Sequence, residues 1–177
     1  NFIGTATISY TIIDGNGGTN SALITVNVVN SRPVALDDSY TTAEDTALVV
    51  NVSGVLTNDS DVDGDSLSAV LVSGPAHGAL TLNADGSFTY SPTNDYHGSD
   101  SFTYRASDGT TNSGLATANI AITLVNDSPV ANNQTAVTPE DTATNLVLTA
   151  SDVDSTNLVF AILTGSTNGT LSLLDTN

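Results

Sequence analysis

Residues 33–46 read PVALDDSYTTAEDT, and residues 129–142 read PVANNQTAVTPEDT. The two segments share PVA at the start and EDT at the end, at an offset of 96 residues. A fixed period of this kind is the sequence signature of a repeat protein, in which each repeat is one structural unit. The chain is therefore predicted to consist of tandem repeats.

The beginning of the chain matches the end of the same repeat. FIGTATISYTIIDG (2–15) aligns with YHGSDSFTYRASDG (96–109), and both continue into an alternating strand that ends at Asn30 or Asn126. We therefore expect the last strands of a first repeat (1–31), a complete repeat (32–126) and the first strands of a third repeat (127–177). Since the chain starts at Asn1 without a signal peptide, we interpret it as cut from a longer precursor or as a mature form.

Each repeat is predicted to be all-β. Alternating apolar and polar residues form short runs between clusters of Gly, Asn, Asp and Pro, and helical periodicity is not convincing anywhere. Phe102, Tyr104 and Ala106 share one face of a predicted strand, and the apolar face of the last strand ends at Leu124. Short strands at this density are typical of a Greek-key, immunoglobulin-like β-sandwich. In the complete repeat, strands are expected near 34–41, 47–52, 67–73, 79–83, 87–91, 101–106 and 115–125.

The charge of the chain limits its partners. Asp and Glu number 19 and Lys and Arg number 2, so the formal net charge is -17. Phosphate binding needs clustered Lys and Arg, so we expect neither nucleic acid nor an anionic membrane as partner. Cations are the natural partners of such a surface. No apolar run approaches the roughly 20 residues that span a bilayer, and the absence of Cys excludes disulfides and cysteine metal sites.

The densest acidic segment is NDSDVDGDS (58–66). It begins like an EF-hand loop at Asp59, but the position that needs a bidentate Glu is Val70. Calcium takes about six to eight oxygens, more than this segment offers alone. Two adjoining ends of neighbouring repeats offer enough, and the Asp-x-Asp pair of 61–63 recurs at 152–154. The alternative is a solvated turn, because Asp and Asn are common turn formers.

Several motifs in order resemble cadherin repeats. GVLTNDSDVDGD (54–65), SPTNDYHGSDSFTY (91–104) and VNDSPVA (125–131) resemble most closely the cadherin-like tandem repeats of large bacterial surface adhesins. TPEDT (138–142) is similar to the cadherin Pro-Glu-Asn motif, and ASDVD (150–154) to its Ala-x-Asp-x-Asp motif. The resemblance covers nearly the whole chain and implies β-sandwich repeats with Ca²⁺ bound at their junctions.

Carried onto the matching positions, the resemblance implies two sets of calcium ligands. One junction has Glu44, Asp100, Asn126, Asp127, Asp152 and Asp154. The other junction has Asn30, Asp61, Asp63 and Asp108. Asp59 and Asp65 are interpreted as turn or outer residues. Since Leu124 and Val125 stand where cadherins have an acidic linker residue, we expect fewer ions per junction than in animal cadherins.

The leading functional hypothesis is a structural, calcium-rigidified segment of an extracellular adhesin stalk or surface fibre, with neighbouring repeats or identical chains as partners. The alternative is a glycan- or protein-binding module of a surface adhesin, although aromatic residues are few. An enzyme is the weakest hypothesis, because His77 and His97 are interpreted as loop residues and no acid–base constellation stands out. The partial repeats at the two ends are complementary, so head-to-tail joining of chains by strand addition is a further expectation.

Overall fold

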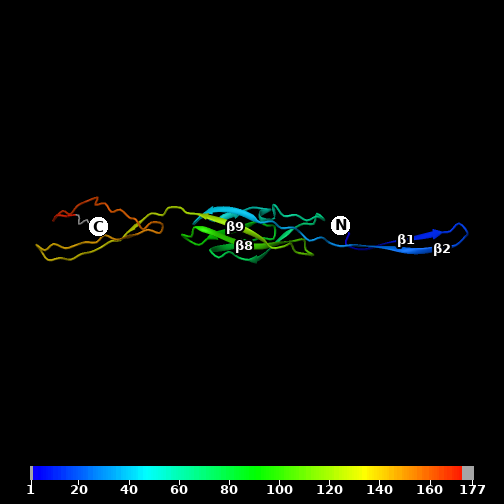
Figure 1. Cartoon of the computed structure of the whole chain (residues 1–177). Helices are drawn as coiled ribbons and strands as arrows, with labels where there is room; N and C mark the ends of the chain where they lie inside the picture. Colours follow the sequence, from blue (N-terminus) through cyan, green and yellow to red (C-terminus); the bar gives the residue numbers. More distant parts are fainter. Residues whose placement is uncertain (1, 173–177) are drawn as a thin grey trace. The chain divides into compact units, whose positions relative to one another are not determined.

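The computed structural model describes residues 2–172, which form two compact units that divide between Leu124 and Val125 (Figure 1). A β-hairpin and a β-sandwich make up the first unit, and one short strand pair lies in the second. No helix within the described range is long and apolar enough to cross a membrane. Asn1 belongs to the first expected segment and residues 173–177 belong to the third, and they lie outside the described residues. The division of the chain into three segments stays a prediction.

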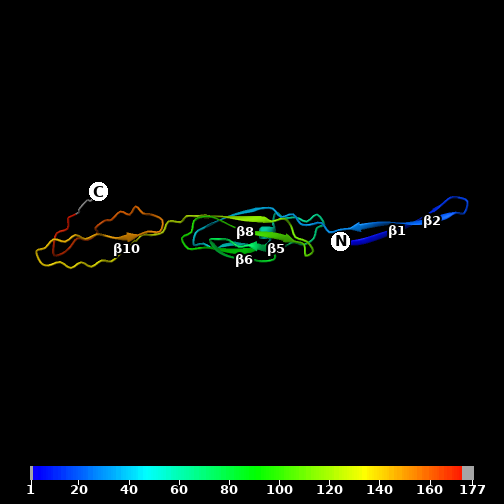
Figure 2. The same ribbon diagram turned by 60° about the horizontal axis from the view of Figure 1, so that its bottom comes forward.

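Seven strands of the first unit form the sandwich: β3 (Asp38–Ala43), β4 (Leu48–Val50), β5 (Ser68–Ser73), β6 (Gly78–Leu82), β7 (Phe88–Pro92), β8 (Gly98–Ser107) and β9 (Ala116–Thr123). One sheet has the order β3-β9-β8-β5 and the other β4-β7-β6 (Figures 1 and 2). β3 is parallel to β9, and the other pairs are antiparallel. This arrangement confirms the predicted all-β, Greek-key sandwich of the immunoglobulin and cadherin type.

Alternate side chains from both sheets form the core. Phe88 from β7 meets Phe102 from β8 edge to face, with ring centroids 5.3 Å apart, an arrangement worth about 0.5–1.5 kcal/mol beyond the burial of area. Also buried are Tyr90, Tyr104, Ala106, Ala116, Ala118, Ile120 and Ile122. The predicted core faces are thus confirmed except at Leu124. That side chain is 49% exposed because β9 ends at Thr123.

The first strand of the sandwich begins later than the sequence predicts. A strand is expected at 34–41, whereas β3 begins at Asp38. Before that point Val34 forms an isolated bridge with Ser60. The Leu36 N–H donates to Asp59 Oδ1 at 2.9 Å, so at Leu36 a side-chain oxygen takes the place of a neighbouring strand. Alternation of apolar residues does not distinguish these two kinds of extended backbone.

The hairpin consists of β1 (Gly4–Ile13) and β2 (Thr19–Val28), paired antiparallel. In its turn, Asp14 Oδ1 accepts hydrogen bonds from the N–H groups of Asn16 and Gly18. One face carries the apolar side chains Ile8, Tyr10, Ile12, Ile24, Val26 and Val28, all of them exposed. The apolar face predicted for the first repeat therefore exists, and nothing in the first unit covers it.

In the second unit, only β10 (Val130–Ala131) and β11 (Ala150–Ser151) pair, also antiparallel. The third repeat is predicted to begin with several strands, but the remaining described residues of this unit form none. Three of their apolar side chains are 93–97% exposed: Val137, Val159 and Leu163. In the sandwich β3 pairs with β9, and the described part of the second unit holds no counterpart of β9. The lack of that partner explains the missing strands.

A buried hydroxyl connects three parts of the sandwich. Tyr104 Oη lies 2.7 Å from Val55 O and 2.9 Å from Asp38 Oδ2. It is also 3.2 Å from Leu36 O and from Asp59 Oδ2. A hydroxyl donates one hydrogen bond, so these oxygens share one donor, and a protonated carboxyl group would supply a second. Burial raises the pKa of Asp38 to about 6, an effect that the Tyr104 bond reduces and the Asp59 charge strengthens.

Replacing Asp38 by Asn should flatten the pH dependence of stability. Because the pKa of Asp38 is raised from 3.8 to about 6 in the folded state, its contribution is complete below pH 3.8 and is lost as the pH rises through about 6. As the pH rises between these two values, urea unfolding should show the free energy of unfolding of the wild-type chain falling relative to that of D38N. The exposed variant D85N is the control and should keep the wild-type slope. A wild-type slope in D38N would contradict the assignment.

Candidate metal centre

An acidic cluster lies in the loop that precedes β5. Asp61, Asp63 and Asp65 each offer a carboxylate oxygen, and these atoms lie within 4.8 Å of one another. Gly64 makes the tight turn with a φ of 75°, a conformation that glycine adopts without steric cost. The sequence pattern leaves Asp65 as a turn or outer residue, whereas the structure places it in the cluster. Three like charges at this separation repel one another unless a cation lies among them.

One oxygen of the cluster is buried without a hydrogen bond. Asp61 Oδ1 accepts from the Asp63 N–H at 2.8 Å, while Asp61 Oδ2 is buried and has no partner among the described residues. A buried carboxylate oxygen loses its hydration without compensation. Ca²⁺ binds carboxylate oxygens of this kind, so the residues present fit a calcium ion.

The linker before the sandwich is bonded to this cluster and to the β8–β9 loop. Asn30 Nδ2 donates to Asp108 Oδ2 at 2.8 Å, and the Ser31 N–H donates to Asp63 Oδ2 at 2.7 Å. With Asp61, the structure thus brings together the four residues predicted for this junction. Their role as metal ligands stays a prediction.

Asp108 is held in an ionised state by its own loop. Its Oδ1 accepts from the N–H groups of Thr110 and Thr111 at 2.6 Å each, and Thr111 Oγ1 donates to Oδ2 at 2.8 Å. Led by the Thr111 N–H, these bonds lower the pKa of Asp108 to about 2 against the opposing effect of burial, and Asn30 adds to them. The carboxylate is therefore charged at neutral pH and fixed in position beside the linker.

The second unit repeats the bonding of the first linker. The Asp127 N–H donates to Asp154 Oδ2 at 2.6 Å, and the Asp154 N–H donates to Asp152 Oδ1 at 2.9 Å. Asn126 Nδ2 donates to Asp127 O at 2.7 Å, as Asn30 does to Ser31 O at 2.8 Å. Four residues predicted for the other junction therefore lie together within the second unit.

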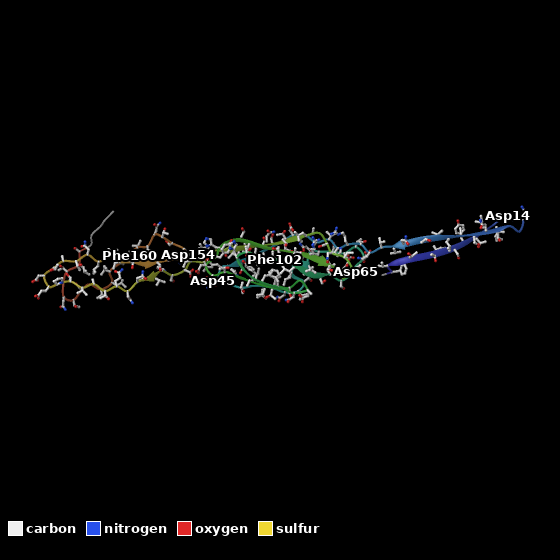
Figure 3. The ribbon with its side chains drawn as sticks, turned by 90° about the horizontal axis from the view of Figure 1, so that it is seen from below. Asp14, Asp45, Asp65, Phe102, Asp154 and Phe160 are labelled. Atoms are coloured by element: carbon white, nitrogen blue, oxygen red, sulfur yellow. The ribbon has the colours of Figure 1, made fainter. Side chains whose placement is uncertain are left out.

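The last two predicted ligands, Glu44 and Asp100, belong to the first unit. Figure 3 shows Asp45, the neighbour of Glu44, and Asp65 at opposite ends of the sandwich. Glu44 is buried, and its Oε2 lies 3.7 Å from His97 Nδ1. The grouping of Glu44 and Asp100 with the acidic residues of the second unit stays a prediction.

Asp100 holds the β5–β6 loop on β8. Its Oδ1 accepts from the N–H groups of Ala76 and Ser101 at 2.9 and 2.8 Å. Its Oδ2 accepts from the His77 N–H and from Tyr90 Oη, both at 2.8 Å. Burial alone would raise the pKa of Asp100, but these donors together lower it. Four donors fill the usual capacity of a carboxylate. Asp100 therefore has a structural role, which the sequence pattern does not reveal.

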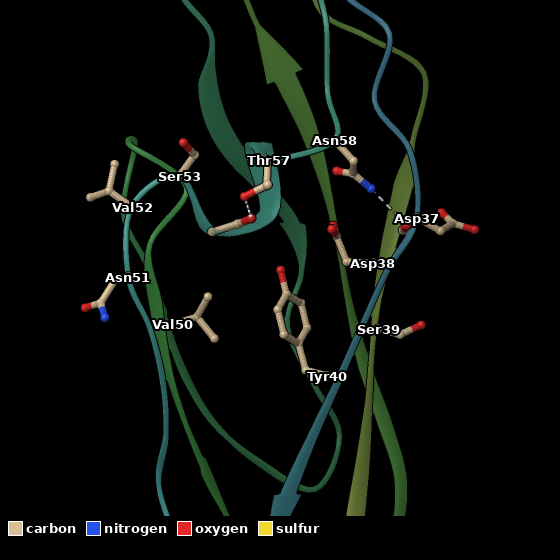
Figure 4. Close-up of a pocket in the computed structure, with 11 residues that line it drawn as sticks. Asp37, Asp38, Ser39, Tyr40, Val50, Asn51, Val52, Ser53, Thr57 and Asn58 are labelled. Atoms are coloured by element: carbon tan, nitrogen blue, oxygen red, sulfur yellow. Dashed lines mark hydrogen bonds between the residues drawn. The ribbon is translucent and has the colours of Figure 1, made fainter.

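A pocket of about 400 Å³ opens beside β3 (Figure 4). Asp38, Tyr40 and Asn51 are among the residues that line it, and Asn58 Nδ2 donates to Asp37 O at 3.1 Å at its edge. Burial raises the pKa of Tyr40 to about 12, so its hydroxyl is protonated at neutral pH. The pocket presents carboxyl, amide and hydroxyl groups.

Comparison with known proteins agrees with this geometry. The family model of the bacterial cadherin-like domain matches residues 30–125. A curated protein, the calcium-binding lectin RapA2 of Rhizobium johnstonii, is 33% identical over 141 residues, which are 64% of this chain and 58% of the relative. The chain therefore spans 58% of the length of the curated relative that it matches.

Solved structures show lower similarity. A protocadherin gammaB7 EC3-6 cis-dimer structure is 17% identical with a TM-score of 0.43, over 85% of this chain and 42% of that chain. An endo-fucoidan hydrolase of glycoside hydrolase family 107, MfFcnA4, is 21% identical with a TM-score of 0.43, over 70% of this chain and 19% of that chain.

Replacing Asp100 by Asn should destabilise the sandwich even without metal. The amide group of Asn cannot accept all four bonds, and a main-chain N–H left without an acceptor costs about 1–3 kcal/mol. Urea unfolding in chelator should therefore show a loss of roughly 2 kcal/mol for D100N and a much smaller loss for the exposed control D85N. A loss that appears only when calcium is present would instead identify Asp100 as a metal ligand.

Proposed function

Because the chain belongs to the bacterial cadherin-like domain family, we propose that it is a calcium-rigidified segment of an extracellular adhesin. The observation that supports this most directly is the linker geometry. In both units, a linker N–H is bonded to the second carboxylate of an Asp-x-Asp pair. A cation on these pairs would therefore act on the linker as well as on the loop. The relative is a calcium-binding lectin, which agrees with this cation.

The chain offers its own residues for each ion. Asp61, Asp63 and Asp65 would hold one ion together with Asn30 and Asp108. Asp152 and Asp154 would hold another with Asn126 and Asp127. Glu44 and Asp100 are the further ligands proposed there, and Asp100 would exchange one of its four hydrogen-bond donors for the ion. When bound, calcium neutralises carboxylates that otherwise repel one another. Short linkers between β-sandwich domains otherwise permit relative motion, so the bound ion stiffens the joint.

An extracellular location follows from the expected affinity. Extracellular calcium modules bind with dissociation constants of about 10⁻⁴–10⁻³ M, which match the calcium concentration outside cells. A net charge of -17 with 2 basic residues further favours a calcium-rich environment. We propose that the chain is part of a stalk or surface fibre, with neighbouring repeats as its direct partners.

Calcium should raise the melting temperature of the chain, and magnesium should do so much less. At about 100 times the dissociation constant, binding stabilises a protein by about 2.7 kcal/mol, roughly 10 °C for a domain of this size. The variants D61N/D63N and D152N/D154N should each lose part of the rise in melting temperature that calcium causes, and D85N should keep all of it. The proposal fails if calcium and chelator give the same melting temperature in the wild-type chain.

Glycan binding is the alternative function. The lectin relative and the pocket beside Asp38 and Tyr40 support it. The aromatic rings that would stack on a sugar are mostly in the core, since Phe88, Tyr90 and Phe102 are buried. The repeated linker geometry therefore supports the stalk function better than the lectin function.

Joining of chains by strand addition is a second proposed function, supported by the exposed apolar face of the hairpin. The alignment of 2–15 with 96–109 makes β1 the counterpart of β8, which in the sandwich pairs with β5 and β9. The second unit is the counterpart of the strands that β8 and β9 cover, and its apolar side chains are exposed. The hairpin of one chain would thus complete the second unit of another, and repetition of this contact gives a head-to-tail fibre.

Substitutions on the two faces of the hairpin test this assembly. Ile8 and Ile24 are paired on the apolar face, and Thr7 and Thr25 are paired on the opposite face. The apparent mass of the wild-type chain should rise with concentration, and I8D/I24D should remain monomeric because a buried charge opposes docking. The matched control T7D/T25D should associate like wild type. A wild-type chain that is monomeric at all concentrations would exclude the fibre.

A further inference from the structure

The two basic side chains of the chain bind the same loop. Arg32 Nη2 donates to Asn112 O at 3.1 Å, and Arg105 Nη1 donates to Ser113 O at 2.8 Å. Lys and Arg number 2 against 19 acidic residues, so the chain places all its guanidinium groups on the β8–β9 loop. That loop also contains Asp108, one of the residues proposed to bind calcium.

Arg32 belongs to the linker as well. Three consecutive linker residues donate hydrogen bonds to loops of the sandwich, each to a different acceptor atom. Asn30 binds the Asp108 carboxylate, Ser31 binds the Asp63 carboxylate, and Arg32 binds the Asn112 carbonyl. The first linker is therefore attached to the sandwich by bonds that need no metal ion.

The two linkers of the chain differ in charge at the same two positions. The first reads NSRP (30–33), and the second reads NDSP (126–129). The flanking Asn and Pro are shared, and so are the hydrogen bonds to the Asp-x-Asp pair. Where the second linker has Asp127 and Ser128, the first has a neutral residue and a guanidinium group. The first linker is thus more positive by two unit charges.

We propose that Arg32 is a built-in counter-ion that makes the first junction less dependent on calcium than the second. The proposal rests on the calcium function proposed above. Asn112, whose carbonyl Arg32 binds, directly follows Thr111, whose N–H binds the Asp108 carboxylate, so the guanidinium charge lies near that carboxylate. A unit charge about one Debye length, roughly 10 Å, from a divalent ion changes the affinity for that ion by roughly twofold once salt screening is included. The first site therefore binds calcium more weakly, and its linker stays attached when calcium is low.

A purely mechanical role for Arg32 predicts the opposite result. If Arg32 only positioned the β8–β9 loop, its removal would displace Asp108 and weaken calcium binding at the first site. If it acts as a counter-ion, its removal strengthens calcium binding there. The sign of the change in affinity therefore separates the two roles.

The experiment measures each site alone in the full chain. The D152N/D154N background leaves the first site and D61N/D63N leaves the second, with calcium affinity measured by titration calorimetry. In the first background, R32S should tighten binding by roughly twofold and S31D/R32S by more, while R32K should match the unsubstituted background. In the second background, S128R, which adds one guanidinium group at the matching position, should weaken binding by a similar factor. In chelator, NMR relaxation should show greater motion of residues 30–33 in R32S than in wild type.

The outcomes separate the two proposals. An unchanged or weaker affinity in R32S, with calcium still bound at both sites, would overturn the role of Arg32 and leave the calcium function intact. Absence of calcium binding in both backgrounds would overturn the calcium function, and the role of Arg32 with it. Melting curves in chelator check that each variant is folded.

Discussion

Main-chain N–H groups are the principal counterparts of the carboxylates in this protein, because the chain has too few basic side chains to pair with them. The N–H of Ser31 binds Asp63, that of Asp127 binds Asp154, and those of Thr110 and Thr111 bind Asp108. Bonds of this kind fix the loops that hold the carboxylates, and at Asp108 they also lower the pKa. The acidic residues are therefore structural elements of the loops even before any ion binds.

Main-chain N–H groups satisfy two acidic side chains of the sandwich less completely. Asp38 accepts from the Tyr104 hydroxyl but from no main-chain N–H group among the described residues, and burial moves its pKa to about 6. Asp61 has one oxygen bonded to main chain and one buried oxygen with no partner in the described structure. One group is thus suited to holding a proton and the other to holding a metal ion. Main-chain bonding is incomplete at both, so a proton at Asp38 and a metal ion at Asp61 would each alter the energetics.

Sequence patterns predict the parts of this structure that depend on periodicity. The strands from β4 to β8 lie within a few residues of the expected ranges, because alternate burial imposes alternate polarity. The Asp-x-Asp pairs are predicted as calcium ligands because they recur in register, and this role stays a prediction. The structural role of Asp100 was not predicted, since a carboxylate that binds four donors looks the same in sequence as a carboxylate that binds metal. Residues 34–37 lie outside the strand because Val34 pairs with Ser60 in a single bridge and Leu36 is held by the side chain of Asp59, which the local pattern does not specify.

The hairpin shows how far a repeat depends on its surroundings. Tyr10 aligns with Tyr104, yet Tyr10 is 49% exposed and Tyr104 is fully buried. Both occupy strands with the same alternation, and both strands are paired to an antiparallel neighbour. The difference is the opposite sheet, which covers β8 and is absent from the hairpin within the first unit. Burial in this family is therefore a property of the complete sandwich, and any part of a repeat that is separated from it presents an apolar surface.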